Sequence, residues 1–210
     1  MGKVELLAPV GDRDALIAAV QNGADAVYLG GRLFGARANA SNFDGDDLAW
    51  AVDYCHLHGV KLYMTINTLV RDDEMRAVYD MAADAVAAGI DAAIVQDLGV
   101  AKMLKESFPG LHLHASTQMS IHSASGAQFV KEMGMARVVP ARECTLEEIS
   151  AIAGTGLEVE VFVHGALCVS YSGQCLLSSM IGGRSGNRGR CAQPCRLPYT
   201  LSGEKRYFLS

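Results

Sequence analysis

The sequence predicts an α/β protein of the (β/α) TIM-like barrel class, either a complete barrel or an incomplete one. Short apolar runs rich in strand-forming residues alternate with longer helical patterns along the chain. Most of the helical patterns begin near Asp, Ser or Thr and end in Gly, as helices do. The repeat length of roughly 22 to 35 residues suits a barrel in which each strand is followed by a helix.

Seven apolar runs are the predicted strands, and six helical patterns separate them. The runs are "VELLA" (4–8), "DAVYLG" (25–30), "VKLYMTIN" (60–67), "DAAIVQ" (91–96), "LHLHAS" (111–116), "ARVVP" (136–140) and "EVEVFVHG" (158–165). This alternation predicts right-handed βαβ units around a parallel sheet. A Rossmann sheet would carry a G-x-G-x-x-G turn after its first strand, whereas the turn here reads "PVGDRD". We therefore assign residues 1–165 to barrel units one to seven.

The composition is that of one sizeable globular domain. The chain has 210 residues, of which 50% are hydrophobic and 20% charged, with a formal net charge of -5. The N-terminus lacks the long apolar region of a signal peptide, and no apolar stretch approaches the roughly 20 residues that span a bilayer. We expect a cytoplasmic protein without a membrane partner. The net acidity argues against a general nucleic-acid-coating protein, although a local basic face could bind a phosphate backbone.

The alternation of strands and helices ends after the seventh predicted strand. Residues 166–205 are small, polar, basic and rich in cysteine, and residues 206–210 read as the start of an eighth strand. A closed eight-stranded barrel would also need a final helix. We expect either an incomplete barrel or a chain that is part of a longer protein.

Polar side chains follow the predicted strands, at the end of the barrel where such proteins do their chemistry. Asp97 and Ser116 are interpreted as helix caps, but caps do not need Arg, Gln or His. Two cationic side chains, Arg37 and Arg142, would suit a carboxylate or phosphate ligand. The candidate substrate-binding residues at these ends are Arg37, Asn39, Asn67, Gln96, Gln118, Arg142 and Glu143.

Four of the six cysteines lie in the stretch after the seventh strand. Cys168, Cys175, Cys191 and Cys195 are separated by six, fifteen and three residues. A reducing compartment argues against disulfides, and zinc sites usually use two tight pairs, of which only the second pair here is one. Iron–sulfur clusters tolerate irregular spacing when a flexible loop wraps them. The spacing therefore favours a [4Fe–4S] cluster on these four residues, with zinc as the alternative, whereas Cys55 and Cys144 are interpreted as inert thiols.

The same stretch is locally basic. Residues 161–203 contain four arginines and no Asp or Glu, so they carry +4 and the rest of the chain carries -9. Arginines in a Gly-rich loop beside a metal site are expected to meet an anion, and Arg188 and Arg190 are the candidates. His164 lies at the end of the seventh predicted strand, where it could act as an acid or base or could hold the loop.

Residues 160–178, "EVFVHGALCVSYSGQCLLS", resemble the signature of the collagenase-like U32 peptidase family. An acidic residue, Phe, His-Gly, a small residue, Cys, Tyr-Ser-Gly, Cys and Ser follow in that order. The resemblance extends to "ELLAPVGD", "GADAVYLGG" and "RANASNF", and so covers essentially the whole chain. Glu160, the acidic residue of the signature, and His164 are the candidate catalytic residues.

The resemblance implies chemistry other than peptide hydrolysis. Members of the family resemble oxygen-independent hydroxylases. Some act on a wobble uridine of tRNA or a cytidine of ribosomal RNA with prephenate as hydroxyl donor, and others act on the ubiquinone ring. Several carry a [4Fe–4S] cluster on four cysteines, and the four cysteines of this chain match positions of that type. Full-length relatives usually continue into further β-rich domains.

Three functions follow as hypotheses. The first is an iron–sulfur hydroxylase that modifies RNA, with tRNA uridine as the expected substrate, RNA held on the local basic face and a dicarboxylate such as prephenate as co-substrate. The second is a peptidase, as the family label states. The third is a protein of ubiquinone hydroxylation or an assembly subunit that bears a cluster without catalysing a reaction, and a homo- or heterodimer is left open.

Overall fold

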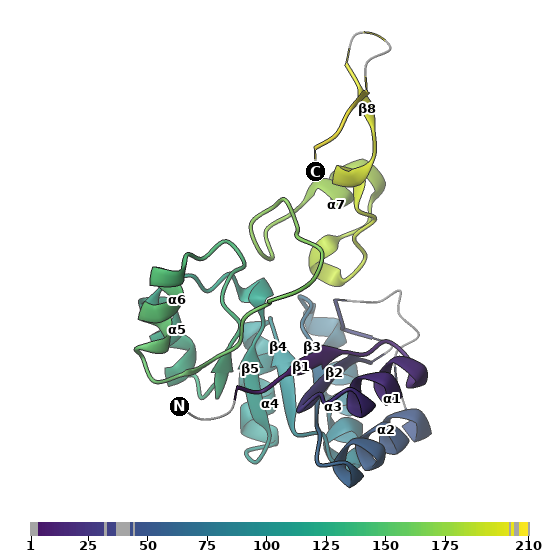
Figure 1. The fold of residues 1–210 in the computed structure, drawn as a ribbon, viewed down its shortest axis with the longest axis vertical. Coiled ribbons are helices and arrows are strands. Elements are labelled where there is room, and N and C mark those ends of the chain that lie inside the picture. Colours follow the sequence, from purple (N-terminus) through teal and green to yellow (C-terminus); the bar gives the residue numbers. More distant parts are fainter. Residues whose placement is uncertain are drawn as a thin grey trace.

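Seven parallel strands form one sheet in the computed structural model, which describes residues 4–31, 33–36, 43, 45–201, 203 and 206–209. The strands follow one another in chain order, and the sheet is an open half-barrel in which β1 and β7 form the two edges (Figure 1). The predicted incomplete TIM-like barrel is thereby confirmed. The strands are β1 (Leu7–Pro9), β2 (Ala26–Gly30), β3 (Lys61–Ile66), β4 (Ala92–Val95), β5 (His112–Ala115), β6 (Arg137–Val138) and β7 (Glu158–Val159).

A helix follows each of the first six strands, as the alternating pattern predicts. None of the helices among the described residues is both long and apolar enough to cross a membrane. The helices are α1 (Arg13–Gln21), α2 (Gly45–Leu57), α3 (Met75–Ala88), α4 (Leu98–Ser107), α5 (Ala124–Glu132) and α6 (Leu146–Ala153).

Helix caps and turns explain where these elements begin and end. The Asp97 carboxylate accepts hydrogen bonds from the backbone N–H groups of Gly99 and Val100 at the start of α4. The Ser116 hydroxyl caps a short 3-10 helix, η2 (Thr117–Met119), in the same way. Both residues therefore act as the caps that the sequence predicts, and each satisfies backbone donors that a helix start leaves without partners.

The sheet has two apolar faces, as the alternation of side chains along a strand requires. The larger core lies between the sheet and the helices and includes Leu62, Val95 and Leu113, each almost fully buried. The opposite, lumen-facing side carries a smaller cluster that includes Tyr63 and Ile94. Little apolar burial is available on this second face, so polar side chains occupy much of it.

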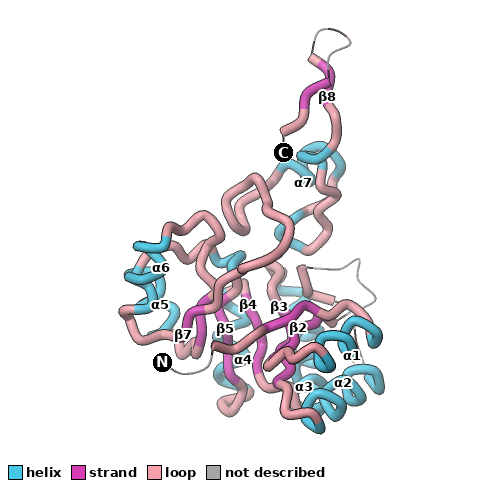
Figure 2. The backbone as a smooth tube through the Cα atoms, in the orientation of Figure 1, coloured by secondary structure: helices cyan, strands magenta, loops and turns pink. Residues whose placement is uncertain are grey.

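The chain after β7 leaves the sheet and folds as a loop-rich segment. Figures 1 and 2 show it beyond one end of the strands, with mostly irregular backbone. Its regular elements are α7 (Leu177–Gly182), η3 (Gly186–Arg188), η4 (Pro194–Arg196), β8 (Tyr199–Thr200) and β9 (Arg206–Tyr207).

Two sequence predictions about this end of the chain differ from the structure. The seventh strand was expected over 158–165, but β7 comprises two residues, because the chain turns away from the sheet after Glu160 bonds to β6. The expected eighth strand at 206–210 contributes only Arg206–Tyr207, which pair antiparallel with β8 in a separate two-stranded sheet. An apolar run of strand-forming residues predicts a strand but not its partner, and here the partner is β8, six to eight residues upstream, rather than β7.

Candidate functional site at the strand ends

A row of buried polar side chains lies directly after three central strands. Asn67 follows β3, Gln96 lies after β4 and Ser116 lies after β5, and each is at most 9% exposed. The Asn67 amide nitrogen lies 3.4 Å from the Ser116 hydroxyl, and its amide oxygen accepts the Ala36 N–H at 2.9 Å. The Gln96 amide nitrogen donates to the backbone carbonyl of Gln118 at 3.4 Å. We call Asn67, Gln96 and Ser116 the polar row.

The cysteine-bearing segment, residues 166–198, is docked on the end of β6 through one fully buried serine. The Ser172 hydroxyl donates to the Glu143 carboxylate at 2.9 Å, and the Ser172 N–H bonds the other oxygen of that carboxylate at 2.9 Å. The same hydroxyl accepts from the Arg142 backbone N–H at 3.2 Å and from its Nε at 3.1 Å. Burial raises the pKa of Glu143, but the two bonds from Ser172 outweigh that effect and keep the pKa below its ordinary value.

Arg142 and Glu143 therefore lie at the strand end as predicted, and the structure adds a role for them. Both residues form hydrogen bonds with Ser172 of the cysteine-bearing segment. Ser172 was not singled out from the sequence, although it belongs to the Tyr-Ser-Gly of the family signature. A serine in a loop gives no signal of burial by itself.

A second set of contacts seats the same segment over β3. The Leu69 N–H donates to the Asn187 carbonyl at 3.1 Å, and the Asn187 amide donates to the Gly173 carbonyl at 2.9 Å. Arg188 forms a two-pronged ion pair with Glu74, with nitrogen–oxygen distances of 2.5 and 2.9 Å. The hydrogen bonds from Arg188 hold the pKa of Glu74 at about 2. Arg188 thus has a carboxylate partner in the protein, whereas Arg190 is exposed.

Two glycines allow the close approach of the segment to the strand ends. Gly173 has φ of +72°, and a Cβ there would lie 2.1 Å from the Gln118 carbonyl oxygen. Gly189 also has φ of +72°, and a Cβ there would lie 2.3 Å from the Gly35 carbonyl oxygen. Only glycine combines a left-handed backbone with such contacts. Both positions show that backbone packs directly on backbone where the segment meets the barrel.

The four cysteines of the segment are free thiols, and Cys168 and Cys191 are exposed. Contacts of neighbouring residues bring the chain around these cysteines together. Next to Cys195 and Cys168, Arg196 donates to the Leu167 carbonyl at 3.0 Å. A Cβ at Gly186 would lie 3.7 Å from the Cys191 Cβ and 3.6 Å from the Cys175 carbonyl oxygen. The Cys191 sulfur accepts the Gln193 N–H at 3.4 Å.

The four thiols have the number and the softness of the ligand set that an iron–sulfur group requires. Their side chains are not assembled as ligands, since no three His, Cys, Asp or Glu residues of the described part of the chain are grouped so that they could hold a metal ion. By contrast, Cys55 is fully buried in the core, and burial raises the pKa of its thiol to about 11, so it is an inert core residue.

A partly buried charge network lies on the lumen side of the sheet. Arg137 on β6 bonds the carboxylates of Glu5 at 2.7 Å and Glu158 at 2.9 Å, and its distance to Glu160 is 3.4 Å. The Tyr63 hydroxyl also donates to Glu5, at 2.9 Å. Burial lowers the pKa of Arg137, but the bonds to Glu5 and Glu158 outweigh it and raise the pKa above its ordinary value. Glu5, which precedes β1, is thereby tied across the lumen to β6.

The two predicted catalytic residues have different surroundings. Glu160 belongs to the charge network, and burial raises the pKa of its carboxyl group above the ordinary value. His164 is exposed in the loop after β7. The structure therefore does not bring the two side chains into one buried site. Arg37 and Asn39, two of the predicted substrate-binding residues, lie outside the described residues.

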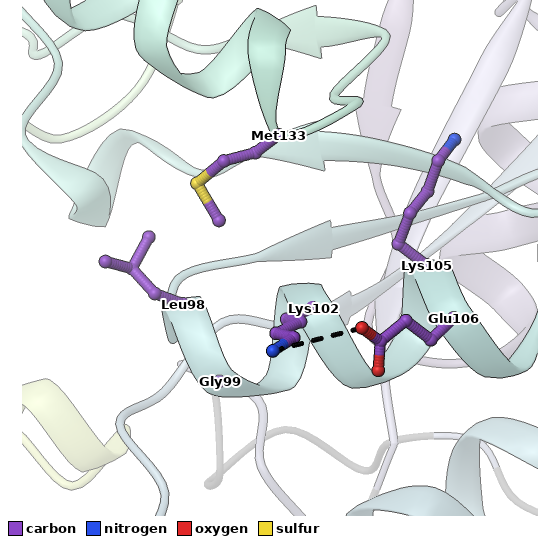
Figure 3. Close-up of a pocket in the computed structure, with 6 residues that line it drawn as sticks. All are labelled: Leu98, Gly99, Lys102, Lys105, Glu106 and Met133. Atoms are coloured by element: carbon purple, nitrogen blue, oxygen red, sulfur yellow. Dashed lines mark ion pairs between the residues drawn. The ribbon is translucent and has the colours of Figure 1, made fainter.

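A surface pocket of about 520 Å³ lies away from these groups, on the helical side of the sheet (Figure 3). It is lined by residues of α4 and by Met133 at the end of α5, and Lys102 pairs with Glu106 across 3.9 Å. Its charged groups are largely exposed, and it holds none of the predicted site residues.

A parallel half-barrel whose strand ends carry buried polar side chains and a docked thiol-bearing segment defines an α/β-barrel protein with its candidate site at the carboxyl ends of the strands. Comparison with protein families assigns it more narrowly. The chain belongs to peptidase family U32, whose model matches residues 11–210.

Curated relatives include both RNA-modifying proteins and a collagenase. The chain is 47% identical over 206 residues to a 23S rRNA 5-hydroxycytidine synthase of Escherichia coli, covering 97% of this chain and 31% of that protein. It is 40% identical over 203 residues to a tRNA hydroxylation protein of Bacillus subtilis, covering 95% and 47%. It is 38% identical over 213 residues to a collagenase of Porphyromonas gingivalis, covering 94% and 50%. The chain thus spans about half or less of the length of these relatives.

Solved structures support the fold. A U32 peptidase structure matches with a TM-score of 0.61 at 16% identity, covering 77% of this chain and 68% of that one. A phosphodiesterase of Oleispira antarctica matches with a TM-score of 0.56 at 11% identity, covering 78% and 85%. At these identities the likeness concerns the barrel architecture alone.

Proposed function

We propose that the protein acts in oxygen-independent hydroxylation of a pyrimidine base in RNA, with tRNA uridine as the expected substrate and a dicarboxylate such as prephenate as the hydroxyl donor. The observation that carries the proposal is the docking of a four-thiol segment on the polar strand ends, through Ser172 and Asn187. The RNA-modifying relatives, at 47% and 40% identity, supply the reaction class.

The reaction exchanges a C5–H bond of the base for a C5–OH bond, which oxidises the base by two electrons. The donor gives up its hydroxyl group and takes the hydrogen, so it is reduced by the same two electrons. A [4Fe–4S] cluster, which Cys168, Cys175, Cys191 and Cys195 would hold, supplies one-electron transfer when bound. The protein itself contributes the strand-end groups that bind and orient the reactants.

The anionic reactants need cations that are not already neutralised. Arg137 is surrounded by three carboxylates and Arg188 is paired with Glu74, so neither is the first partner of an incoming anion. Arg190 is exposed in the Gly-rich loop and Arg142 is half-buried at the strand end. We therefore assign anion contact to these two arginines.

The test is nucleoside analysis of total RNA from a deletion strain. Loss of a hydroxylated nucleoside, restored by the full-length wild-type gene and not by its Cys175→Ser variant, is the expected result. Cys144→Ser is the matched control, because this thiol lies outside the segment, and it should restore the nucleoside. An unchanged nucleoside profile beside an altered quinone pool would overturn the RNA substrate.

Peptide hydrolysis is the second candidate, and the collagenase relative favours it. Ser172 is hydrogen-bonded to a carboxylate, but its hydroxyl is fully buried and no imidazole is among its bonded partners. Ser172 is therefore neither accessible to a substrate nor paired with an imidazole as general base, as the nucleophile of a serine hydrolase would be. Cleavage of denatured collagen by protein that lacks all four segment cysteines would establish this activity instead.

A further inference from the structure

The lumen face at the polar row contains two buried polar atoms without partners. The Gln96 amide oxygen and the His114 Nδ1 have no hydrogen-bond partner among the described residues, although the two side chains are only 7% and 4% exposed. Buried polar groups are normally satisfied, because each one left without a partner costs about 1–3 kcal/mol. Two such atoms on neighbouring strands indicate a place prepared for a ligand.

Strand register places the two atoms on the same side of the sheet. Ile94 of β4 is paired with His114 of β5, and Ile94 belongs to the lumen-facing apolar cluster. Gln96 lies two residues beyond Ile94, so its side chain points to the same face. Gln96 is therefore one pleat nearer the strand ends than His114, on the adjacent strand.

Hydrogen bonding fixes what Gln96 offers. Its amide nitrogen donates to the Gln118 carbonyl, which can only accept, so the free atom is the oxygen. A free amide oxygen recognises an N–H or O–H donor and gives nothing to a carboxylate. Burial lowers the pKa of His114 to about 3, so its ring is neutral and Nδ1 can accept as well.

The surrounding charges also select against an anion at this place. Arg137, a cation of the lumen face, bonds Glu5 and Glu158 and has Glu160 3.4 Å away, and Lys61 bonds Glu5 at 3.2 Å. Both cations are already paired with carboxylates, so neither is free to receive an anionic ligand. The ligand of the lumen face should therefore be neutral and rich in donors.

We propose that Gln96, with His114 one pleat deeper, binds the N–H edge of the pyrimidine base that is to be hydroxylated. This inference rests on the proposed function and identifies which part of the substrate enters the lumen. A pyrimidine presents ring N3–H in uracil or an exocyclic amino group in cytosine on this edge, and its C5 takes no part in the contact. A base that has left its stack is read in this way by other base-modifying enzymes.

The experiment compares two RNA probes by fluorescence anisotropy on the full-length protein. One probe is a short single-stranded oligouridine and the other is the same oligomer with 3-methyluridine, which lacks the N3–H donor. Wild-type protein should bind the first about tenfold more tightly, as expected for one hydrogen bond to a buried group. Gln96→Met should reduce this ratio to below about twofold, whereas Gln128→Met, at an exposed helical glutamine, should leave it unchanged.

Gln96→Glu keeps oxygen acceptors at the position and should retain the preference, which provides a second variant should Gln96→Met fold poorly. Equal binding of both probes by wild-type protein, or an undiminished ratio in Gln96→Met, would overturn the inference. Weaker binding of prephenate by Gln96→Met with an unchanged RNA ratio would also overturn it, because the donor molecule would then occupy the site. The affinity ratio could fall in Gln96→Met as expected while the deletion strain loses no hydroxylated nucleoside. This result would refute the proposed reaction and would still support the contact between Gln96 and the base.

Discussion

Replacement of Ser172 by alanine should weaken the docking of the cysteine-bearing segment on the barrel while leaving the barrel folded. The hydroxyl is fully buried and joins three groups at the end of β6: the Glu143 carboxylate, the Arg142 backbone N–H and the Arg142 side chain. Alanine removes these three bonds and the 3.4 Å contact from the Thr117 hydroxyl. It leaves the bond from the backbone N–H of residue 172 to Glu143 and the bond from the Ser120 hydroxyl to the carbonyl of residue 172. Backbone packing at Gly173 is unaffected by the change.

The size of the effect follows from the kinds of bond that are lost. Two of the three involve a charged partner, and such bonds are worth about 1.5–3 kcal/mol each when buried. The Glu143 side chain is exposed, so water replaces part of what it loses. We expect the docking free energy of residues 166–198 to fall by about 2–3 kcal/mol.

Hydrogen exchange measured by mass spectrometry provides the assay, because protection of a locally opening segment reports its own free energy. Amide protection in residues 166–198 should fall roughly 30- to 150-fold in Ser172→Ala, while protection in β2 to β5 stays the same. Ser178→Ala is the matched control, since Ser178 is also buried in the segment but its hydroxyl accepts from Ala192 rather than from the barrel. Unchanged protection of residues 166–198 in Ser172→Ala, or an equal loss of their protection in Ser178→Ala, would refute the docking role.

Three further predictions test other parts of the structure. His114 has its pKa lowered by burial to about 3, so the unfolded chain binds more protons and stability should fall as the pH drops from 6.5, by up to about 1.4 kcal/mol per pH unit; urea unfolding at pH 7 and pH 5 should show a smaller dependence in His114→Asn, and equal slopes would contradict the assignment. Gly173→Ala places a Cβ against a backbone carbonyl at positive φ and should cost about 1–3 kcal/mol in thermal unfolding, whereas Gly182→Ala, which meets nothing within 4 Å, should cost far less. Arg188→Ala should raise the pKa of Glu74 from about 2 toward its ordinary value, as followed by carboxyl carbon NMR; an unmoved titration would show that the pair does not persist in solution.

Much of the fold is predictable from the sequence, because a buried parallel strand and an amphipathic helix each leave a periodic pattern. The seven strands occur in the expected order, and Asp97 and Ser116 cap helices as predicted. The pattern overestimated β7, since apolar residues also occur in the loop that leads to the cysteines. It misassigned Arg206–Tyr207, because strand propensity carries no information about the partner strand.

Residues of the candidate site were predictable only where a polar residue followed an apolar strand pattern. Asn67 and Gln96 stood out because polar residues at the ends of apolar strands are uncommon. The network around Arg137 did not, since Glu5 is 132 residues away in the sequence and only the curvature of the sheet brings the two together. Arg188 was expected to meet a substrate anion and instead bonds Glu74, a partner that sequence spacing could not reveal.

The open half-barrel has a consequence for how the protein behaves at high concentration. Strands β1 and β7 are the outer strands of the seven-stranded sheet, and exposed strand edges are templates for pairing between molecules. Two features limit such pairing. Strand β1 ends in proline, which has no backbone N–H to donate. Strand β7 has only two residues and begins with the charged Glu158, which the ion pair with Arg137 holds against β6. In this part of the chain, the two outer strands are therefore poor templates for pairing with another molecule.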